Sequence, residues 1–158
     1  MLRTGVCSAA VAAVALTACS TVVRQPEVRV EGVRVGGIGL QGGLLYVLLE
    51  VENPNGFALE ANGLTYDIDV RHQENGDTSW VDLVDGQYED DIRIGSRQID
   101  RLEIPIEFTY REMGGALRTL IDRGSFTYRI SGAVALNEPL RRSVPYRKSG
   151  VVTLGGSR

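Results

Sequence analysis

The alternation of apolar and polar side chains is clearest between residues 44 and 71. Leu44 to Val51 is almost wholly apolar and β-prone, which predicts a strand covered on both faces. From Leu64 to Arg71 apolar and polar residues alternate strictly, the pattern of a half-buried antiparallel strand. Between these strands, Asn53-Pro54-Asn55-Gly56 predicts a sharp corner, because Pro54 cannot donate to a ladder and the next two residues tolerate positive φ. We expect the two strands and their corner to form one edge of a β-sandwich.

Further strands are predicted on both sides of this pair. Residues 28–35 alternate with a change of phase near Gly32, and Asn75-Gly76 predicts a hairpin whose return strand, residues 79–84, leaves Trp80 partly exposed. Asp85-Gly86 predicts another turn, followed by a weak acidic strand over residues 88–94. Residues 99–110 alternate without a break, and Pro105 on the polar phase indicates an edge strand or a bulge.

The last third of the chain changes period once. Apolar residues at helical spacing predict a short amphipathic helix over residues 111–122, with Gly124 as its C-terminal stop. Period two returns over residues 125–136, where Gly132 stands in the apolar phase and indicates that a neighbour packs close to its backbone. Asn137-Glu138-Pro139 predicts a turn, and strands over residues 140–146 and 151–154 complete the fold before a frayed tail, residues 155–158.

Seven to nine strands and one short helix predict an all-β, predominantly antiparallel sandwich. The length of 158 residues allows one domain with a real core, which we place at residues 28–154.

The N-terminus carries a targeting pattern. Arg3 supplies a positive flank, and Val6 to Leu16 is an apolar run too short to span a membrane as a stable helix. The run ends in Leu16-Thr17-Ala18-Cys19, which resembles the bacterial lipoprotein box, in which the cysteine is acylated and the preceding peptide is removed. The resemblance implies a signal peptide over residues 1–18 and a lipidated tether over residues 19–27. The alternative is an ordinary secretory signal with a chance cysteine near its cleavage site, and secretion follows on either interpretation.

Cysteine and charge counts agree with this organisation. Cys7 lies inside the predicted signal and Cys19 would carry lipid, so no cysteine remains for a disulfide, and stability must come from core packing. Removal of residues 1–18 takes away one basic residue, Arg3, and changes the formal net charge from −3 to −4. An acidic chain without a clustered basic segment argues against nucleic-acid binding.

An ordered set of short motifs resembles the late embryogenesis abundant type 2 family, the family of the water stress and hypersensitive response domain. The residues that carry the resemblance are Asn53, Pro54, Asn55, Leu64, Tyr66, Pro105, Tyr128 and Gly132, together with the short helix. The resemblance covers most of residues 28–154. It implies an immunoglobulin-like or fibronectin-type-III-like sandwich, an association with desiccation and other stress, and no enzyme activity. The segment from His72 to Asp91 looks longer than the usual connection in that family.

Candidate chemistry is sparse. His72 is the one histidine, so neither a zinc site nor a serine hydrolase site is supported, and no cofactor is expected. A group of acidic residues could supply oxygen ligands for calcium, but its spacing fits no EF-hand loop, and a solvated acidic edge that resists strand pairing is favoured. These residues are Asp82, Asp85, Glu89, Asp90 and Asp91. Asn53 and Asn55 are interpreted as turn residues that bond to backbone, and the glycine pairs fit no phosphate loop.

These observations predict a non-enzymatic lipoprotein of the cell envelope, attached to its membrane through lipid on Cys19, whose stress-associated domain protects or binds neighbouring proteins or membrane. Ser20 after the lipid site resembles the default pattern for export to the periplasmic face of an outer membrane, if the cell has one. The alternative is a transport accessory that holds an apolar ligand between its sheets or docks onto an envelope complex. An enzyme is a more distant third.

Overall fold

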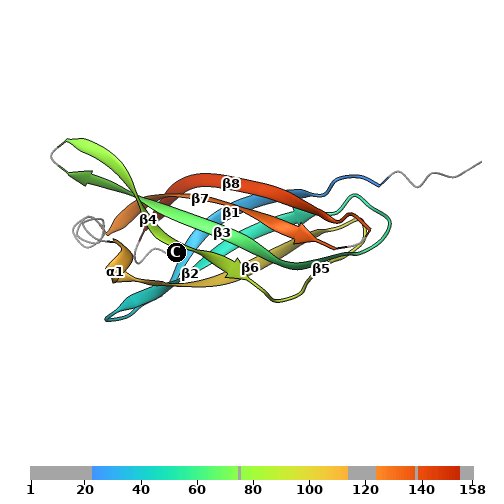
Figure 1. Ribbon diagram of the computed structural model, residues 1–158, viewed down its shortest axis with the longest axis horizontal. Helices are drawn as coiled ribbons and strands as arrows, with labels where there is room; N and C mark the ends of the chain where they lie inside the picture. Colours follow the sequence, from blue (N-terminus) through green and yellow to red (C-terminus); the bar gives the residue numbers. More distant parts are fainter. Residues whose placement is uncertain (1–22, 75, 114–123, 138, 154–158) are drawn as a thin grey trace, which may run out of the picture.

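The chain forms a sandwich of two antiparallel sheets, seen edge-on in the computed structural model (Figure 1). The structure describes residues 23–74, 76–113, 124–137 and 139–153. The elements are β1 (Glu27–Ile38), β2 (Gly42–Glu52), β3 (Leu59–Glu74), β4 (Asp77–Tyr88), β5 (Ile92–Ile94), β6 (Ile99–Thr109), α1 (Tyr110–Met113), β7 (Ser125–Leu136) and β8 (Arg142–Thr153). One sheet has the order β1-β2-β6, and the other has the order β4-β3-β7-β8, with β5 paired to one end of β3. The predicted all-β sandwich is therefore confirmed.

The core lies between the two sheets, where alternate residues of each strand point inward. On β2 the inward residues are fully buried, and they are Leu45, Val47, Leu49 and Val51. Facing them on β3 and β7 are the equally buried Ile68, Val70 and Ile130. The core side chains among the described residues fall between residues 28 and 152, so a chain that begins at Ser20 contains all of them.

Two expectations about β2 are wrong. Its outer face is half exposed rather than covered, because no further layer of described residues lies over the three-stranded sheet. Tyr46 on that face is shielded by the Arg34 guanidinium, 4.5 Å from its ring centre. The corner does not form an edge either. β2 is the middle strand of one sheet and β3 is an inner strand of the other, so Asn53-Pro54-Asn55 carries the chain from sheet to sheet.

Several predicted local features are confirmed. Glu74 pairs with Asp77 across the predicted hairpin, although Asn75 itself lies outside the described residues. The register of β1 shifts between Val30 and Gly32, which is the predicted change of phase. Pro105 lies on β6, an edge strand paired only with β2 within its sheet. Trp80 is half exposed, with the Arg129 guanidinium 4.8 Å from its ring centre.

Other boundaries differ. Asp85 and Gly86 do not turn the chain; they pair with Asp67 and Tyr66 inside β4, because the ring of Tyr66 occupies the space that Gly86 leaves. The expected strand over residues 88–94 is therefore divided between the end of β4 and the three-residue β5. The two expected last strands are one continuous strand, β8, that pairs along all of β7.

The predicted helix lies largely outside the described residues, which contain only its first turn as α1. The frayed tail, residues 155–158, also lies outside them. No helix within the described ranges is long and apolar enough to cross a bilayer.

Candidate functional site

Asn53 is the most deeply buried polar residue of the corner, with 1% of its surface exposed. Its side-chain N–H groups donate to the carbonyls of Phe57 and Gly95, each at 2.8 Å. Its side-chain oxygen accepts from the backbone N–H of Asn55 at 3.0 Å and from the side-chain N–H of Asn55 at 3.1 Å. All of the hydrogen-bonding capacity of the amide is used within the protein, so Asn53 fastens the corner and is not available to a ligand.

Asn55 fastens the segment that precedes β1. Its side-chain oxygen accepts from the backbone N–H of Arg24, and its side-chain N–H donates to the carbonyl of Arg24, both at 2.8 Å. We call this pair of bonds the Arg24–Asn55 clasp. Within the predicted tether, residues 19–27, Arg24 is hydrogen-bonded to the sandwich, Pro26 is buried and Glu27 belongs to β1, while residues 19–22 lie outside the described residues.

A second loop closes over the same corner. The backbone N–H of Asn53 donates to the carbonyl of Gln98, and the backbone N–H of Arg97 donates to the carbonyl of Asn55, both at 3.0 Å. Pro54 has no N–H to satisfy, which suits a position between these two bonded residues. The connections between β2 and β3 and between β5 and β6 thus meet the N-terminal segment at one end of the sandwich, on the right in Figure 1. We call it the corner end.

Tyr66 and Gly132, the other two motif residues, lie in the middle of the five-stranded sheet, paired with each other across β3 and β7. A Cβ on Gly132 would lie 2.0 Å from the carbonyl oxygen of Thr65 and 2.6 Å from the hydroxyl of Tyr146. The Tyr146 hydroxyl donates to that same carbonyl at 2.7 Å. The predicted close approach at Gly132 is thus present, and its cause is a tyrosine that fills the space left by a glycine on the neighbouring strand.

The same arrangement recurs at two more cross-strand pairs. The Tyr66 hydroxyl lies over Gly86, and the Tyr128 hydroxyl lies over Gly150. Burial raises the pKa of Tyr128, and burial together with the neighbouring Tyr66 raises the pKa of Tyr146 well above its ordinary value of about 10. The three phenols are therefore neutral packing groups at physiological pH.

The residues considered for catalysis or calcium binding do not converge. His72 lies on β3, while Asp82 and Asp85 are exposed on β4, and Glu89 to Asp91 lie between β4 and β5. Within the described ranges, no group of three His, Cys, Asp or Glu side chains could hold a metal ion. Cys19 and Ser20 lie outside the described residues.

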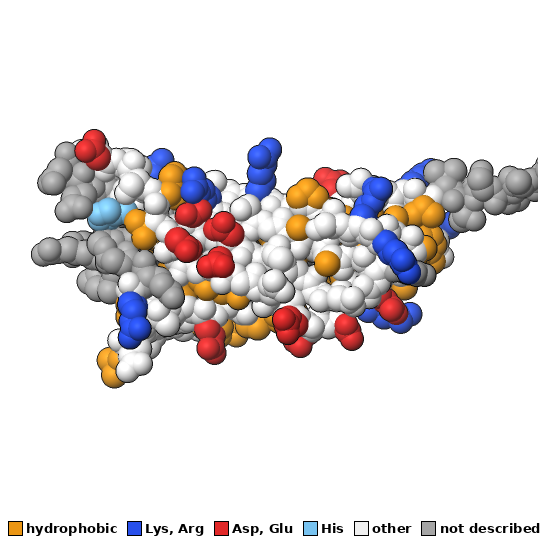
Figure 2. Space-filling view, viewed as in Figure 1, with side chains coloured by type: hydrophobic (Ala, Val, Ile, Leu, Met, Phe, Trp, Pro, Cys, Tyr) orange, Lys and Arg blue, Asp and Glu red, His pale blue; other side chains and the backbone are white. Residues whose placement is uncertain are grey.

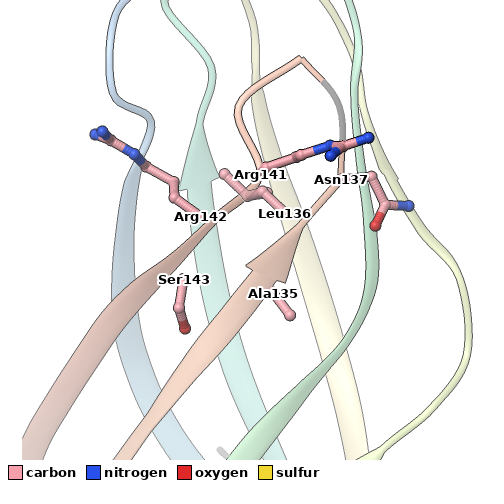
Figure 3. Close-up of a pocket in the computed structure, with 6 residues that line it drawn as sticks. All are labelled: Ala135, Leu136, Asn137, Arg141, Arg142 and Ser143. Atoms are coloured by element: carbon pink, nitrogen blue, oxygen red, sulfur yellow. The ribbon is translucent and has the colours of Figure 1, made fainter.

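Surface depressions on the described part of the sandwich are shallow and open. One of about 510 Å³ lies at the corner end, lined by Leu136, Asn137, Arg141 and Arg142 among others (Figure 3). Another of about 520 Å³ lies at the opposite end, over the glycine-rich connection between β1 and β2. Neither reaches between the sheets, where the inward side chains are closely packed.

Sequence reasoning missed two features of this region. The clasp depends on backbone groups of Arg24, which no side-chain pattern records; the alternation of Pro26, Val28 and Val30 was the available signal that the fold begins earlier. The tyrosine–glycine pairs depend on strand register, which becomes known only when the partners of each strand are known.

Comparison with known proteins gives one family and several related folds. The family model described as late embryogenesis abundant protein (LEA_2) matches residues 48–150. A solution structure of AT1g01470 from Arabidopsis thaliana superimposes with a TM-score of 0.66 at 14% identity, covering 86% of each chain. A crystal structure of a protein from Archaeoglobus fulgidus gives a TM-score of 0.57 at 14% identity, covering 83% of this chain and 98% of the other. A comparison with curated protein sequences gave no match.

Proposed function

This chain belongs to the late embryogenesis abundant type 2 family, and from that membership we propose that it is a membrane-anchored lipoprotein of the cell envelope that protects neighbouring proteins or membrane during water loss. The family is associated with stress and is generally non-enzymatic. The proposal adds to this a lipid on Cys19, a place in the envelope and a protective rather than a catalytic role.

The observation that carries the anchoring is the run Leu16-Thr17-Ala18-Cys19 after a short apolar segment. The clasp supports it by fixing where an anchored domain would stand. Arg24 lies five positions after Cys19, and an extended chain over five residue steps reaches about 17–18 Å. The domain would therefore be held against its membrane with its corner end nearest the lipid.

The alternative, a carrier that holds an apolar ligand between the sheets, finds no support in the described residues. Such a carrier needs an enclosed cavity, whereas the inward residues of both sheets fill the space between them. The other alternative is a transport accessory that docks onto an envelope complex. The experiments that follow distinguish it from a protective protein.

Acylation is tested by growing bacterial cells that express the full chain with an alkyne-bearing fatty acid, and by measuring label on the protein. We expect label on the wild type and on Cys7→Ser, because Cys7 lies in the removed segment, and none on Cys19→Ser. Label that persists on Cys19→Ser would exclude the lipid site.

Protection is tested separately with the chain that begins at Ser20. A labile enzyme is dried or freeze–thawed beside this chain or beside an equal mass of albumin, and its remaining activity is measured. We expect more activity with the chain than with albumin. Equal activity would remove the protective role and leave the anchoring untouched.

A further inference from the structure

We propose that the corner end is a docking surface for a membrane rich in anionic lipid, with the guanidinium groups of Arg24, Arg97 and Arg142 contacting lipid phosphates. The inference rests on the proposed anchoring for its orientation, and on the observations below for the surface itself.

The three arginines are brought together by the corner. Arg24 is held in the clasp with Asn55, and the backbone N–H of Arg97 donates to the carbonyl of the same asparagine. The guanidinium of Arg142 donates to the side-chain oxygen of Gln25 at 3.0 Å. Three segments distant in the sequence therefore present exposed cations at one end, where Figure 2 shows Lys and Arg side chains beside the grey N-terminal segment.

The charges of these three arginines are not compensated by a close carboxylate, unlike those of several other exposed arginines. Among the described residues, no carboxylate lies within 4 Å of the side chains of Arg24, Arg97 or Arg142. Five other exposed arginines do face carboxylates: Arg29 with Glu27, Arg34 with Glu103, Arg93 with Glu60, Arg101 with Glu31, and Arg129 with Asp69. The three guanidinium groups therefore have no close carboxylate among the described residues, on a chain of net negative charge.

Backbone conformation gives an independent reason to expect a role for the side chains. Among the described residues, the non-glycine residues with positive φ are Arg97, at 53°, and Arg141, at 37°. Both are at the corner end, in the connections between β5 and β6 and between β7 and β8. A glycine would adopt this conformation with less strain, so an arginine there indicates a use for its side chain.

The depression beside Arg142 has a suitable form for a lipid headgroup. It is about 510 Å³, open on its outer side, and Arg141, Arg142 and the Asn137 amide stand around it (Figure 3). Guanidinium groups bind phosphate oxygens through paired hydrogen bonds. Val23 and Ile99 expose apolar side chains at the same end, as expected where a protein meets the boundary between headgroups and acyl chains.

The length of the tether makes the membrane the occupant that these observations favour. A lipid on Cys19 would hold Arg24 within about 18 Å of the bilayer. Attraction to anionic lipid falls off over a Debye length of about 8 Å at physiological salt, and a tether that reaches at most about 18 Å lets the arginines approach the bilayer to within that range. The negative remainder of the chain would turn the corner end toward the bilayer.

The test uses the chain that begins at Ser20, which has no lipid, so that docking and acylation are measured apart. Its partition onto vesicles of 30% phosphatidylglycerol in phosphatidylcholine is measured by flotation, alongside vesicles of phosphatidylcholine alone. We expect binding to the anionic vesicles only, lost when the salt concentration is raised to about 0.5 M. The triple variant Arg24→Gln, Arg97→Gln, Arg142→Gln should bind at least tenfold more weakly, because each cation near an anionic surface contributes.

A matched triple variant, Arg34→Gln, Arg71→Gln, Arg147→Gln, removes the same charge from exposed positions away from the corner end and should bind within threefold of the wild type. Thermal unfolding establishes that both variants are folded. Equal weakening by the two triple variants, or equal binding to neutral and anionic vesicles, would overturn the proposal. Anionic binding with no label on Cys19 would support docking and reject acylation, whereas label without anionic binding would do the reverse.

Discussion

The two ends of the sandwich are closed in opposite ways. At the corner end, two buried asparagines bond three loops together, and Asn53 alone satisfies two carbonyls and an N–H of the backbone. At the far end, on the left in Figure 1, glycines let the β1–β2 hairpin lie against β6, with Gly42 close to the backbone of Phe108. Buried asparagine side chains distinguish the first end, and missing side chains distinguish the second, where Tyr110 also donates hydrogen bonds to the carbonyls of Gly39 and Gln41. Different substitutions should therefore destabilise the two ends.

The largest effect is expected from Asn53→Ala. The change leaves buried backbone groups of Phe57, Gly95 and Asn55 without their partner, and each such group costs about 1–3 kcal/mol. We expect a loss of about 3–4 kcal/mol in the free energy of unfolding, measured by urea denaturation. Asn62→Ala, an exposed asparagine, is the matched control and should cost less than about 0.5 kcal/mol.

At the far end, Gly42→Ala should come next. A Cβ there would lie 2.0 Å from the Phe108 carbonyl oxygen, so β2 and β6 would have to separate, at about 2–3 kcal/mol. Gly37→Ala is the control in the same hairpin, since nothing lies within 4 Å of its added Cβ. Equal stability of the two variants, measured by thermal unfolding, would show that close approach does not hold this end together.

Asn55→Ala should have a smaller global effect, about 2 kcal/mol, with a distinct local one. Loss of the clasp frees the segment around Arg24 from the sandwich, so trypsin should cut after Arg24 faster than in the wild type or in Asn62→Ala. Peptide mass measurements over time follow that cleavage. An unchanged rate would mean that the clasp does not hold the segment.

Midway between the ends, Tyr146→Phe tests a response to pH. The pKa of the folded Tyr146 is raised, so an unfolded tyrosine loses its proton near pH 10 while the folded one keeps it. Stability is thus insensitive to this group below about pH 9 and falls above pH 10. The variant loses the bond to Thr65, about 1 kcal/mol at pH 7, and should show a shallower decline above pH 10 in urea titrations. A decline of the same steepness in both proteins would contradict this cause.

The smallest effect is expected at the tip of the far end. Leu40 is fully exposed, so Leu40→Ala should change the free energy of unfolding by less than about 0.5 kcal/mol. A loss above 1 kcal/mol, measured by urea denaturation, would show that the tip is packed in solution.

The part of this fold that could be predicted is the part set by the repeated alternation of apolar and polar residues along the chain. Alternation located β6 and β7 closely, and the polar phase of Pro105 marked an edge. Features that depend on which strand lies alongside could not be predicted from the sequence alone. Asp85-Gly86 has the composition of a turn, yet both residues lie within β4, where the ring of Tyr66 on the neighbouring strand packs over Gly86.

The corner was predicted as a turn because local chemistry suffices for that. Its role as a junction was not, since the partners of Asn53 and Asn55 lie at Gly95 and Arg24, distant in the sequence. The arginines of the corner end are also scattered along the chain, so no run of basic residues indicated that they would lie on one surface.

The clasp has a mechanical consequence. A pull on the chain ahead of Arg24, such as drag on a domain fastened to a bilayer, loads the two bonds to Asn55 before any strain reaches β1. Those bonds lead through Asn53 to the loops of both sheets, so the load is shared by the whole sandwich instead of peeling one strand from its edge.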